Sequence, residues 1–499
     1  MDTQYQKLKT LLAEIVDLQG AAALLGWDQQ VNMPPEGAEA RGNQLGTLGR
    51  IAHDRGTAPE LGKLLDELKP YAAGLDPDSD EARLIKVAAR DYDKAVRIPS
   101  NFVVEQSQVQ SLSYQAWMEA RQKSDFSHFR PHLEKVIELA QRYVTFFPPA
   151  DHPYDILLDD YEPGMKTAEV QAIFDAIRPK QVELIKAIAG KPQVDDSFLH
   201  QPFDEKKQWD FGVTVITQFG YDWRRGRQDK APHPFTQGTS VNDVRITTRV
   251  DPKFLNTMLF GTMHECGHGL YGQGLAPELD RTPLGDGASL AVHESQSRLW
   301  ENLVGRSLPF WQHFYPRLQA DFPQLKKVSL DRFYRGINKV QPSLIRVEAD
   351  EATYNLHIML RMEIEIALVE GKVAVKDLPE MWNARMKDYL GVTPPNDAVG
   401  VLQDVHWSSG MIGYFSTYAL GNLISAQLWE KVNQDLPDLS GQIRDGKFDA
   451  LLGWLRAKVH RHGRKFEPQE LVQQVTGSRI DPQPYLRYLN RKYGEIYGV

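Results

Sequence analysis

The chain has 499 residues, of which 25% are charged, and its formal net charge is −8 at pH 7. Acidic and basic residues are interspersed along it, which argues against a nucleic-acid-binding surface and is typical of a soluble protein. The single cysteine, Cys266, excludes an intramolecular disulfide bond. A chain of this length is usually divided into domains, but no linker, low-complexity run or internal repeat marks a boundary, so we expect one large helical body with subdomains.

The first predicted element is a charged amphipathic helix at the N-terminus. Its apolar side chains recur at helical spacing and are Leu8, Leu11, Leu12, Ile15, Val16 and Leu18. The residues before them lack the apolar core of a signal peptide, so we expect a cytoplasmic protein. Further along, Pro34-Pro35 and Pro148-Pro149 predict breaks between helices.

A β-strand is predicted over residues 243–250, which are rich in β-branched side chains and roughly alternate between apolar and polar. It follows a turn-rich stretch that contains His233-Pro234-Phe235. If the next helix binds a metal ion, the edge of a small sheet beside it could bind an extended peptide as an additional strand. A purely structural hairpin is an equally open interpretation.

The most informative motif is His264-Glu265-Cys266-Gly267-His268, which has the H-E-x-x-H spacing. Residues four apart lie on one face of a helix, so His264 and His268 can bind one metal ion together. Glu265 is then close enough to hold a water molecule at that ion, which predicts a zinc hydrolase, most readily a peptidase. The alternative is a helix with two histidines that only pack or hydrogen-bond. The motif leaves the position of Cys266 free, so we expect a structural cysteine, with a reactive thiol as the alternative.

A catalytic zinc site needs a third protein ligand. Tyr271 and Gly274 stand where a metzincin would have its glycine and its third histidine, so that class is excluded. A loop rich in glycine and proline follows, and then residues 288–300 have the apolar spacing of a helix. Within that helix Glu294 is the first candidate for the third ligand. His293 is its rival, and only one of the two is expected to coordinate, because adjacent helical side chains point about 100° apart.

Two later segments are predicted to be buried helices. Residues 353–369 are densely apolar, and residues 405–429 are the one stretch of membrane length without a formal charge. The polar side chains of this second segment argue against a membrane span, so we expect a buried helix that forms a wall of the active site. Its His406, Tyr414 and Tyr418 are candidates to stabilise an oxyanion, and a core aromatic residue is the alternative for each tyrosine.

Six short motifs follow one another along the chain. They are His233-Pro234-Phe235 for H-P-F, Asp243-Val244-Arg245-Ile246-Thr247 for D-x-R-x-T, the H-E-x-x-H segment, His293-Glu294-Ser295-Gln296 for H-E-S-Q, Ile345-Arg346-Val347-Glu348-Ala349-Asp350 for I-R-x-x-A-D, and Gly400-Val401-Leu402-Gln403 for G-x-x-Q. Near the N-terminus, Trp27-Asp28-Gln29 followed by Met33-Pro34 is a further segment that resembles the same family as these six motifs. In this order the motifs make the chain similar to the carboxypeptidase Taq family of metallocarboxypeptidases over nearly its whole length.

The resemblance implies a mainly α-helical, cleft-bearing zincin fold related to neurolysin and the angiotensin-converting enzymes, with a small β-sheet near the active site. It implies a single metallocarboxypeptidase domain over residues 1–499, with helical subdomains flanking a deep cleft. One divalent metal ion per subunit is implied, usually zinc and sometimes cobalt, in a homodimer. The implied activity is the release of single C-terminal amino acids from peptides, with broad specificity.

The expected mechanism starts from a metal ion that lowers the pKa of its water toward neutrality. Glu265 takes the proton, the hydroxide attacks the scissile carbonyl, and Glu265 passes the proton to the leaving amine. By resemblance, a histidine and a tyrosine of residues 405–429 face the metal.

A carboxypeptidase must also bind a free carboxylate, for which the planar fork of arginine is suited. Arg346 is the first candidate and Arg245 the second, and His233 and Gln403 complete the predicted substrate contacts. The alternative for an arginine close to an acidic residue is a local ion pair.

Ligand histidines usually donate their second ring N–H to a carboxylate or a carbonyl group. In some related zinc peptidases that carboxylate lies four residues after the ligand glutamate, where this chain has Arg298. Glu301 or Asp350 is expected to serve instead.

Two other functions are open on the sequence alone. One is a zinc endo-oligopeptidase or dipeptidyl carboxypeptidase of related fold, which would share the metal site and Glu265. The other is an inactive helical binding protein, against which the intact Glu265 argues. An aminopeptidase is disfavoured because the chain has no G-x-M-E-N element. The expected partners are peptides with a free C-terminus. Binding to nucleic acid or to a membrane is not expected.

Overall fold

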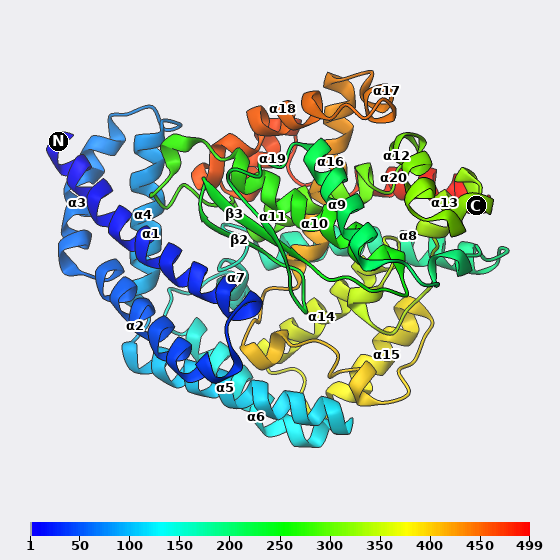
Figure 1. Cartoon of the computed structure of the whole chain (residues 1–499). Coiled ribbons are helices and arrows are strands. Elements are labelled where there is room, and N and C mark those ends of the chain that lie inside the picture. The colour runs from blue at the N-terminus through cyan, green and yellow to red at the C-terminus, as the bar shows by residue number, and fades with distance from the viewer. Residues whose placement is uncertain (1) are drawn as a thin grey trace. The chain divides into compact units, whose positions relative to one another are not determined.

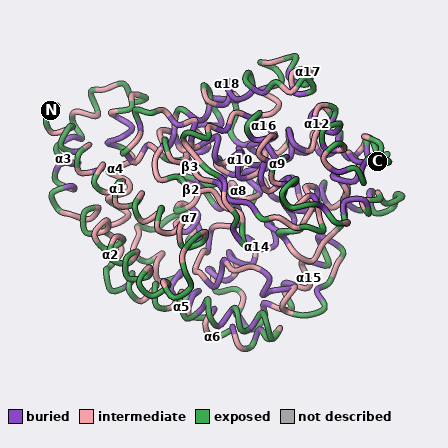
Figure 2. The backbone as a smooth tube through the Cα atoms, viewed as in Figure 1, coloured by how far each residue is buried: buried purple, intermediate pink, exposed green. Residues whose placement is uncertain are grey.

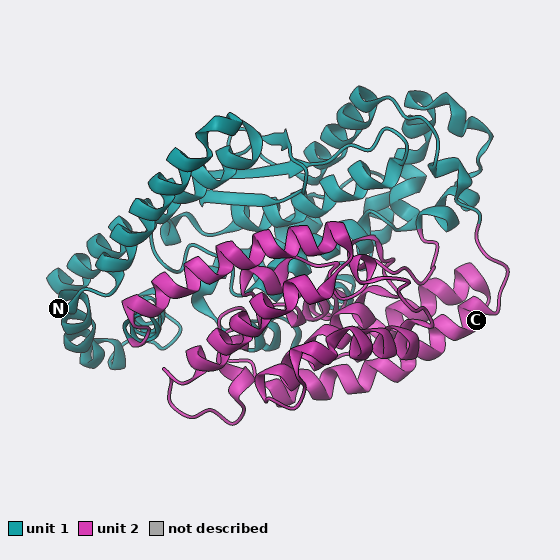
Figure 3. Ribbon diagram, turned by 90° about the horizontal axis from the view of Figure 1, so that it is seen from below, with its two compact units in different colours: residues 1–96, 195–337, 428–477 teal, residues 97–194, 338–427, 478–499 magenta. Residues whose placement is uncertain are grey.

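The computed structural model describes residues 2–499, and its internal contacts divide the chain into two compact units (Figure 3). Unit 1 comprises Met1–Val96, Asp195–Ile337 and Leu428–Gly477. Unit 2 comprises Arg97–Val194, Asn338–Gln427 and Ser478–Val499. Each unit is therefore assembled from three segments that are distant in the sequence.

Unit 1 is mainly helical and contains the sheet of the protein (Figure 1). Its helices are α1 (Asp2–Val31), α2 (Ala38–Gly56), α3 (Pro59–Ala73), α4 (Asp80–Arg97), α9 (Glu205–Phe219), α10 (Leu255–Gly274), α11 (Leu290–Arg298), α12 (Leu308–Asp321), α13 (Leu330–Ile337), α17 (Leu439–Arg444), α18 (Asp449–Lys458) and α19 (Pro468–Thr476). The predicted breaks at both proline pairs are confirmed, because α1 ends at Val31 and no helix covers Pro148 or Pro149.

The sheet has three strands in the order β1-β3-β2. They are β1 (Gln228–Lys230), β2 (Thr236–Ser240) and β3 (Asp243–Thr248). The central strand β3 runs parallel to β1 and antiparallel to β2, and Ile246 is the register partner of both Gln228 and Thr236. The predicted strand is confirmed over Asp243–Thr248 and ends two residues earlier than expected. Both β2 and β3 contact α10, the helix that carries the H-E-x-x-H motif (Figure 1).

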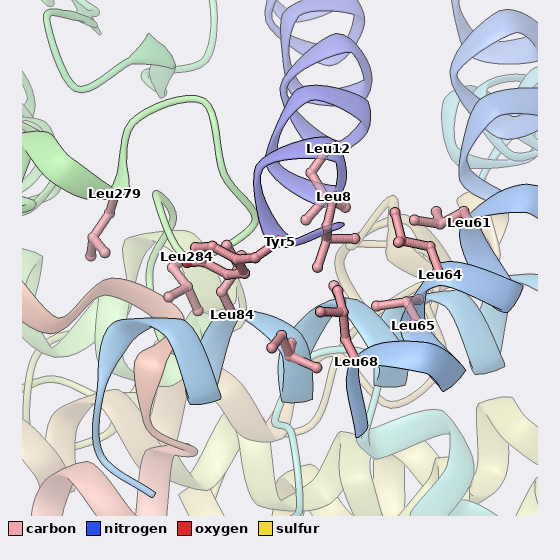
Figure 4. Close-up of a cluster of buried hydrophobic side chains, with 12 residues drawn as sticks. Tyr5, Leu8, Leu12, Leu61, Leu64, Leu65, Leu68, Leu84, Leu279 and Leu284 are labelled. Carbon is pink, nitrogen blue, oxygen red and sulfur yellow. The ribbon is translucent and has the colours of Figure 1, made fainter. Parts of the chain in front are cut away.

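The N-terminal end of unit 1 has its own hydrophobic cluster, formed mainly by α1, α3 and α4 (Figure 4). Leu8 and Leu12 of α1 are buried there, and Leu11 and Ile15 pack against the cluster. This arrangement confirms the predicted apolar face from Leu8 to Ile15, whereas Val16 and Leu18 are partly buried and lie outside the cluster. Burial of this face holds the amphipathic helix in place.

Unit 2 is built from helices, and several of them contact α14 (Tyr354–Val369). They are α5 (Ser100–Lys123), α6 (Phe126–Val144), α7 (Pro153–Leu158), α8 (Thr167–Ala189), α14 (Tyr354–Val369), α15 (Leu378–Leu390), α20 (Gln483–Tyr497) and the part of α16 (Ser416–Asp435) that ends at Gln427. Every residue of α14 from Tyr354 to Met362 is buried, which confirms the predicted buried helix (Figure 2).

The prediction of one continuous helix over residues 405–429 is wrong in its first half. A short 3-10 helix covers His406–Ser409, and α16 begins only at Ser416. Between them Gly410 and Gly413 have φ angles of 71° and 98°. This left-handed conformation ends a right-handed helix, and glycine adopts it at little cost. The segment is largely buried as expected, but His406 begins the 3-10 helix and Tyr414 lies on the loop before α16.

No helix within residues 2–499 is long and apolar enough to cross a membrane.

Candidate active site

Helix α10 carries the H-E-x-x-H motif of unit 1. One turn separates His264 from His268, and their ring centroids lie 5.0 Å apart on the same face of the helix. This is the arrangement that the four-residue spacing predicts.

Helix α11 brings Glu294 to the two histidines. The Nε2 atom of His264 lies 3.6 Å from Glu294 Oε2, and the Nε2 atom of His268 lies 3.5 Å from the same oxygen. One ligand atom from each of the three residues lies within 4.8 Å of the other two, and Glu294 is 4% exposed. The structure thus brings together the three residues that the sequence predicts as metal ligands.

Gly267, inside the motif, allows α11 to approach α10 this closely. A Cβ atom at Gly267 would lie 2.6 Å from both the carbonyl oxygen of Gln296 and the Cα atom of Ser297. Helix α11 begins nearby with Ser289 as its N-cap, whose side chain accepts a hydrogen bond from Val292 N. Only glycine permits this contact between the backbones of two helices.

We therefore expect Gly267→Ala to destabilise the protein by about 1–3 kcal/mol and to weaken metal binding, because the added methyl group pushes α11 and Glu294 away from α10. Thermal unfolding with and without added zinc measures both effects. Gly261→Ala in the same helix is the control, since its Cβ would approach nothing closer than Pro234 Cγ at 4.0 Å. Equal stability and equal zinc affinity of the two variants would contradict this account of the helix contact.

Glu301 lies behind His264. After Arg298, α11 continues as a π-helix over Leu299–Val304. Glu294, Arg298 and Glu301 have the spacing i, i+4, i+7 and share one helix face. The Nδ1 atom of His264 lies 2.9 Å from Glu301 Oε2. Of the two predicted carboxylate partners, Glu301 thus contacts a ligand histidine, whereas the carboxylate of Asp350 accepts hydrogen bonds from its own segment of unit 2.

His293, the rival candidate for the third ligand, lies behind His268 instead. The two Nδ1 atoms are 2.7 Å apart, so one ring donates a hydrogen bond to the other. Because this bond uses the Nδ1 atom of His268, its Nε2 atom is the one that faces Glu294. His293 therefore contacts the predicted ligand His268 from behind and is not one of the three residues that could hold a metal ion together.

Arginines keep both buried glutamates ionised. Arg298 Nε lies 2.6 Å from Glu294 Oε1, and Arg306 lies 3.4 Å from Glu301 Oε1. Burial alone would raise the pKa of Glu294, but Arg298 and the two ligand histidines outweigh it and hold that pKa well below its usual range. Burial likewise opposes the effect of Arg298 and His264 on Glu301, whose pKa is lowered to about 2. Both carboxylates are thus negative at neutral pH, as cation binding requires.

These residues fit a divalent metal ion. A tetrahedral zinc site with bonds of about 2.0–2.1 Å has its ligand atoms about 3.4 Å apart, close to the two distances from Glu294 Oε2. Both predicted ligand histidines have their Nδ1 atoms engaged by other side chains, which leaves their Nε2 lone pairs available to a metal ion. The donor set of two imidazoles and one carboxylate is that of catalytic zinc sites.

The motif contains two further side chains that could react, Glu265 and Cys266. Glu265 is 6% exposed, and its Oε2 atom lies 2.7 Å from Thr236 Oγ1. Cys266 is fully buried, and burial raises the pKa of its thiol well above the usual value. The thiol is therefore neutral, which favours the structural interpretation of Cys266 over a reactive thiol.

In unit 2, His406 and Tyr418 are in contact. His406 Nε2 lies 3.3 Å from Tyr418 Oη, and the ring of Tyr414 lies 5.2 Å from that of His406. Burial lowers the pKa of His406 to about 3, so the ring is neutral at physiological pH. The structure thus gathers the three predicted oxyanion donors in one cluster.

Glu365 of α14 binds the segment that contains His406. It accepts hydrogen bonds from Tyr154 Oη, Trp407 Nε1 and the backbone N–H of Gly413, at 2.6, 2.8 and 3.0 Å. Burial raises the pKa of Glu365 to about 7. Two of these donors, Trp407 and Gly413, belong to the segment that replaces the first half of the predicted helix, so this carboxylate holds that segment in place.

Arg346 belongs to the same region of unit 2 and is buried. Its Nε and Nη2 atoms lie 3.0 and 2.8 Å from Asp404 Oδ1, and its guanidinium group lies over the ring of Tyr418, 4.8 Å from the centroid. Arg361 shares Asp404 through a contact of 2.6 Å. Two buried arginines thus face one carboxylate, and this cluster carries one net positive charge.

Gln403 is buried beside these arginines. Its Oε1 atom accepts hydrogen bonds from Arg346 N and from Arg361, each at 2.8 Å. Its Nε2 atom donates to backbone carbonyl groups, among them that of Leu344 at 2.9 Å. Both polar ends of the side chain have protein partners, which favours a structural role over the predicted contact with substrate.

The two remaining predicted residues lie in unit 1. Arg245 on β3 makes a two-point ion pair with Asp243, with both distances 2.8 Å, and lies over the ring of Trp27 at 4.4 Å from the centroid. Its charge is therefore balanced one to one. His233 is exposed on the loop between β1 and β2.

Several residues of these clusters were missed by the sequence analysis. Asp404 directly follows Gln403 and could have been found by extending that motif by one residue. Arg361 and Glu365 lie in a helix whose sequence pattern is dominated by apolar residues, which gives no signal for these two. Thr236 directly follows His233-Pro234-Phe235, but no pattern in the sequence indicated its contact with Glu265.

Comparison with known proteins identifies the family. The model of the carboxypeptidase Taq (M32) metallopeptidases matches residues 7–493. Thermostable carboxypeptidase 1 of Thermus thermophilus is 42% identical, over 100% of this chain and 99% of that protein. Carboxypeptidase 1 of Bacillus subtilis is 40% identical, over 98% and 97% of the two chains. The crystal structure of the M32 carboxypeptidase from Deinococcus radiodurans R1 is 43% identical, covers 100% of both chains and has a TM-score of 0.96.

These relatives confirm the resemblance deduced from the six motifs and the mainly helical fold. Because they are carboxypeptidases, they do not favour the endo-oligopeptidase alternative. The chain therefore belongs to the carboxypeptidase Taq (M32) family of metallopeptidases.

Proposed function

We propose that this metal-dependent carboxypeptidase binds one zinc ion through His264, His268 and Glu294 and releases single amino acids from the C-terminus of peptides, with broad specificity. The observation that carries the proposal is that the Nε2 atoms of both histidines lie 3.6 and 3.5 Å from the same oxygen of Glu294. Zinc is the first choice for this donor set, and cobalt is the alternative.

A divalent cation at this position supplies Lewis acidity, which acidifies water and polarises a carbonyl group. Glu265 takes the proton from the attacking water and delivers it to the leaving amine. Its position next to His264 on α10 and its burial support this role. We assign the stabilisation of the oxyanion to His406 with Tyr414 or Tyr418, because a neutral imidazole and a phenol are both hydrogen-bond donors.

Arg346 is the proposed receptor for the C-terminal carboxylate of the substrate. The cluster of Arg346, Arg361 and Asp404 carries one net positive charge in a buried environment, where an additional anion is favourable. Arg245, the second candidate, is already neutralised by Asp243. Arg245 is neutralised by its own partner, whereas the cluster around Arg346 keeps a positive charge, which supports Arg346 as the site for the substrate carboxylate.

A peptide and its C-terminal amide test this assignment. We expect the amide to have a kcat/KM about 10- to 100-fold lower, because it lacks the charge that Arg346 binds. In Arg346→Gln this difference should shrink, and the fold should persist because Arg361 still pairs with Asp404. Arg245→Gln is the matched control and should keep the preference for the free acid. Equal cleavage of acid and amide by the wild-type protein would refute recognition of a free C-terminus.

The homodimer is proposed on the family resemblance alone. Light scattering coupled to size-exclusion chromatography tests it, and a mass of one chain at micromolar concentration would exclude it.

A further inference from the structure

A hydrogen bond links the sheet of unit 1 to the Glu265 carboxylate. Thr236 is the first residue of β2, and its Oγ1 atom lies 2.7 Å from Glu265 Oε2 and 3.0 Å from the Glu265 carbonyl oxygen. A threonine hydroxyl has one hydrogen to donate, and an ionised carboxylate is the stronger acceptor. Within residues 2–499, Thr236 is the one side chain that hydrogen-bonds to this carboxylate.

The backbone next to Thr236 is fixed by the central strand. Phe235 N donates a hydrogen bond to Thr247 Oγ1 at 2.8 Å, and Thr247 N donates to the Phe235 carbonyl group at 2.9 Å. Thr247 is fully buried, and Thr236 itself is in register with Ile246. The H-P-F and D-x-R-x-T motifs therefore meet at the point where the chain enters β2.

Helix α10 packs against the same central strand. A Cβ atom at Gly269 would lie 3.1 Å from Ile246 Cγ2, and one at Gly272 would lie 3.1 Å from two methyl carbons of Val244. Direct contact between α10 and β3 fixes the distance between Glu265 and the sheet. The distance between Thr236 and Glu265 is thus fixed at both ends by β3.

We propose that Thr236 is a positioning residue for Glu265, a proposal that rests on the proposed role of Glu265 in proton transfer. The hydroxyl group holds Oε2 and leaves Oε1 as the oxygen that exchanges a proton with water and the leaving amine. A glutamate side chain has several rotamers, and a small displacement of a reacting group reduces the rate strongly. The two motifs on either side of the turn therefore serve to place the base.

A purely structural role of the hydrogen bond between Thr236 and Glu265 would lead to different results. It would change the stability of the protein and leave the turnover of the folded fraction unchanged. A positioning role lowers kcat and leaves KM nearly unchanged, because the lost interaction matters in the transition state and not in substrate binding.

The test compares Thr236→Val, Thr236→Ser and Thr239→Val on a peptide substrate in the zinc-loaded enzyme. We expect Thr236→Val to lower kcat by about 10- to 100-fold, by analogy with the loss when a side chain that orients a metal ligand is removed. Its KM should change by less than about twofold, and its zinc content should remain that of the wild type. Thr236→Ser keeps the hydroxyl group and should restore kcat to within about threefold of the wild type. Thr239→Val removes a hydroxyl from the same strand that bonds to Asp243, and should not lower kcat.

Two results would overturn the proposal. One is a wild-type kcat in Thr236→Val, and the other is a Thr236→Ser variant as slow as Thr236→Val. If Thr236→Val does not fold, Thr236→Ala removes the same hydroxyl with a smaller side chain and is subject to the same criteria. Glu265→Gln is measured in parallel: an active Glu265→Gln removes the proposed role of Glu265, whereas an inactive one beside an active Thr236→Val overturns only the role of Thr236.

Discussion

Replacing Glu265 with glutamine is expected to lower kcat by about 10²- to 10⁴-fold, the usual contribution of general acid–base catalysis. Glutamine has nearly the same shape and can still accept the hydrogen bond from Thr236 through its amide oxygen, but it cannot take a proton. The metal group of His264, His268 and Glu294 is untouched, so the zinc content should remain at one ion per chain. Steady-state kinetics and elemental analysis of the same preparation measure the two quantities.

The matched control for this variant is Glu278→Gln, which removes an exposed carboxylate from the same unit. It should have the kcat of the wild type. If Glu265→Gln retained a kcat within threefold of the wild type, the assignment of Glu265 as the base would be wrong, whatever its metal content.

Replacing Glu294 with glutamine is expected to weaken zinc binding by more than about 100-fold and to abolish turnover at limiting zinc. The variant loses the negatively charged carboxylate oxygen that lies close to both histidines. Loss of a metal ligand itself weakens binding more than loss of a side chain that only orients a ligand. Competition with a fluorescent zinc chelator measures the affinity.

Measurements with and without a chelator show whether Glu294→Gln has lost its metal ion or has lost stability for another reason. A bound ion stabilises the folded state by mass action, so a chelator should lower the Tm of the wild type and leave that of Glu294→Gln unchanged. Arg298 loses a partner in the variant, and the comparison of the two metal-free proteins isolates that effect. A Glu294→Gln protein that keeps one tightly bound zinc ion per chain would exclude Glu294 as a ligand.

The elements that the sequence predicted well are those with a local pattern. The spacing of His264 and His268, the helical context of Glu294, the β-branched residues of β3 and the apolar residues of α14 each depend on a few neighbouring residues. Glu301 was predicted as a partner of a ligand histidine from its residue type alone, together with Asp350, and the structure places Glu301 beside His264.

The contacts that were not predicted join residues that are distant in the sequence. Periodicity identifies the buried face of an element but not its partner, so neither the bond between Thr236 and Glu265 nor the pairing of Arg361 with Asp404 could be deduced. The helix break near Gly410 and Gly413 was missed for another reason. The absence of charge from residues 405–429 favours one buried helix, whereas Gly410 and Gly413, three residues apart, favour a turn. The relation to neurolysin-like enzymes and the single-domain organisation stay predictions.

The central claim is that one metal ion is bound by His264, His268 and Glu294. Anomalous diffraction from crystals of the zinc-loaded protein, recorded above and below the zinc absorption edge, tests it most directly. The account predicts one strong anomalous peak per chain, within about 2.0–2.2 Å of both Nε2 atoms and of a Glu294 carboxylate oxygen. A principal zinc peak bonded to other residues, or a zinc-loaded and active enzyme without a peak between these three, would contradict it.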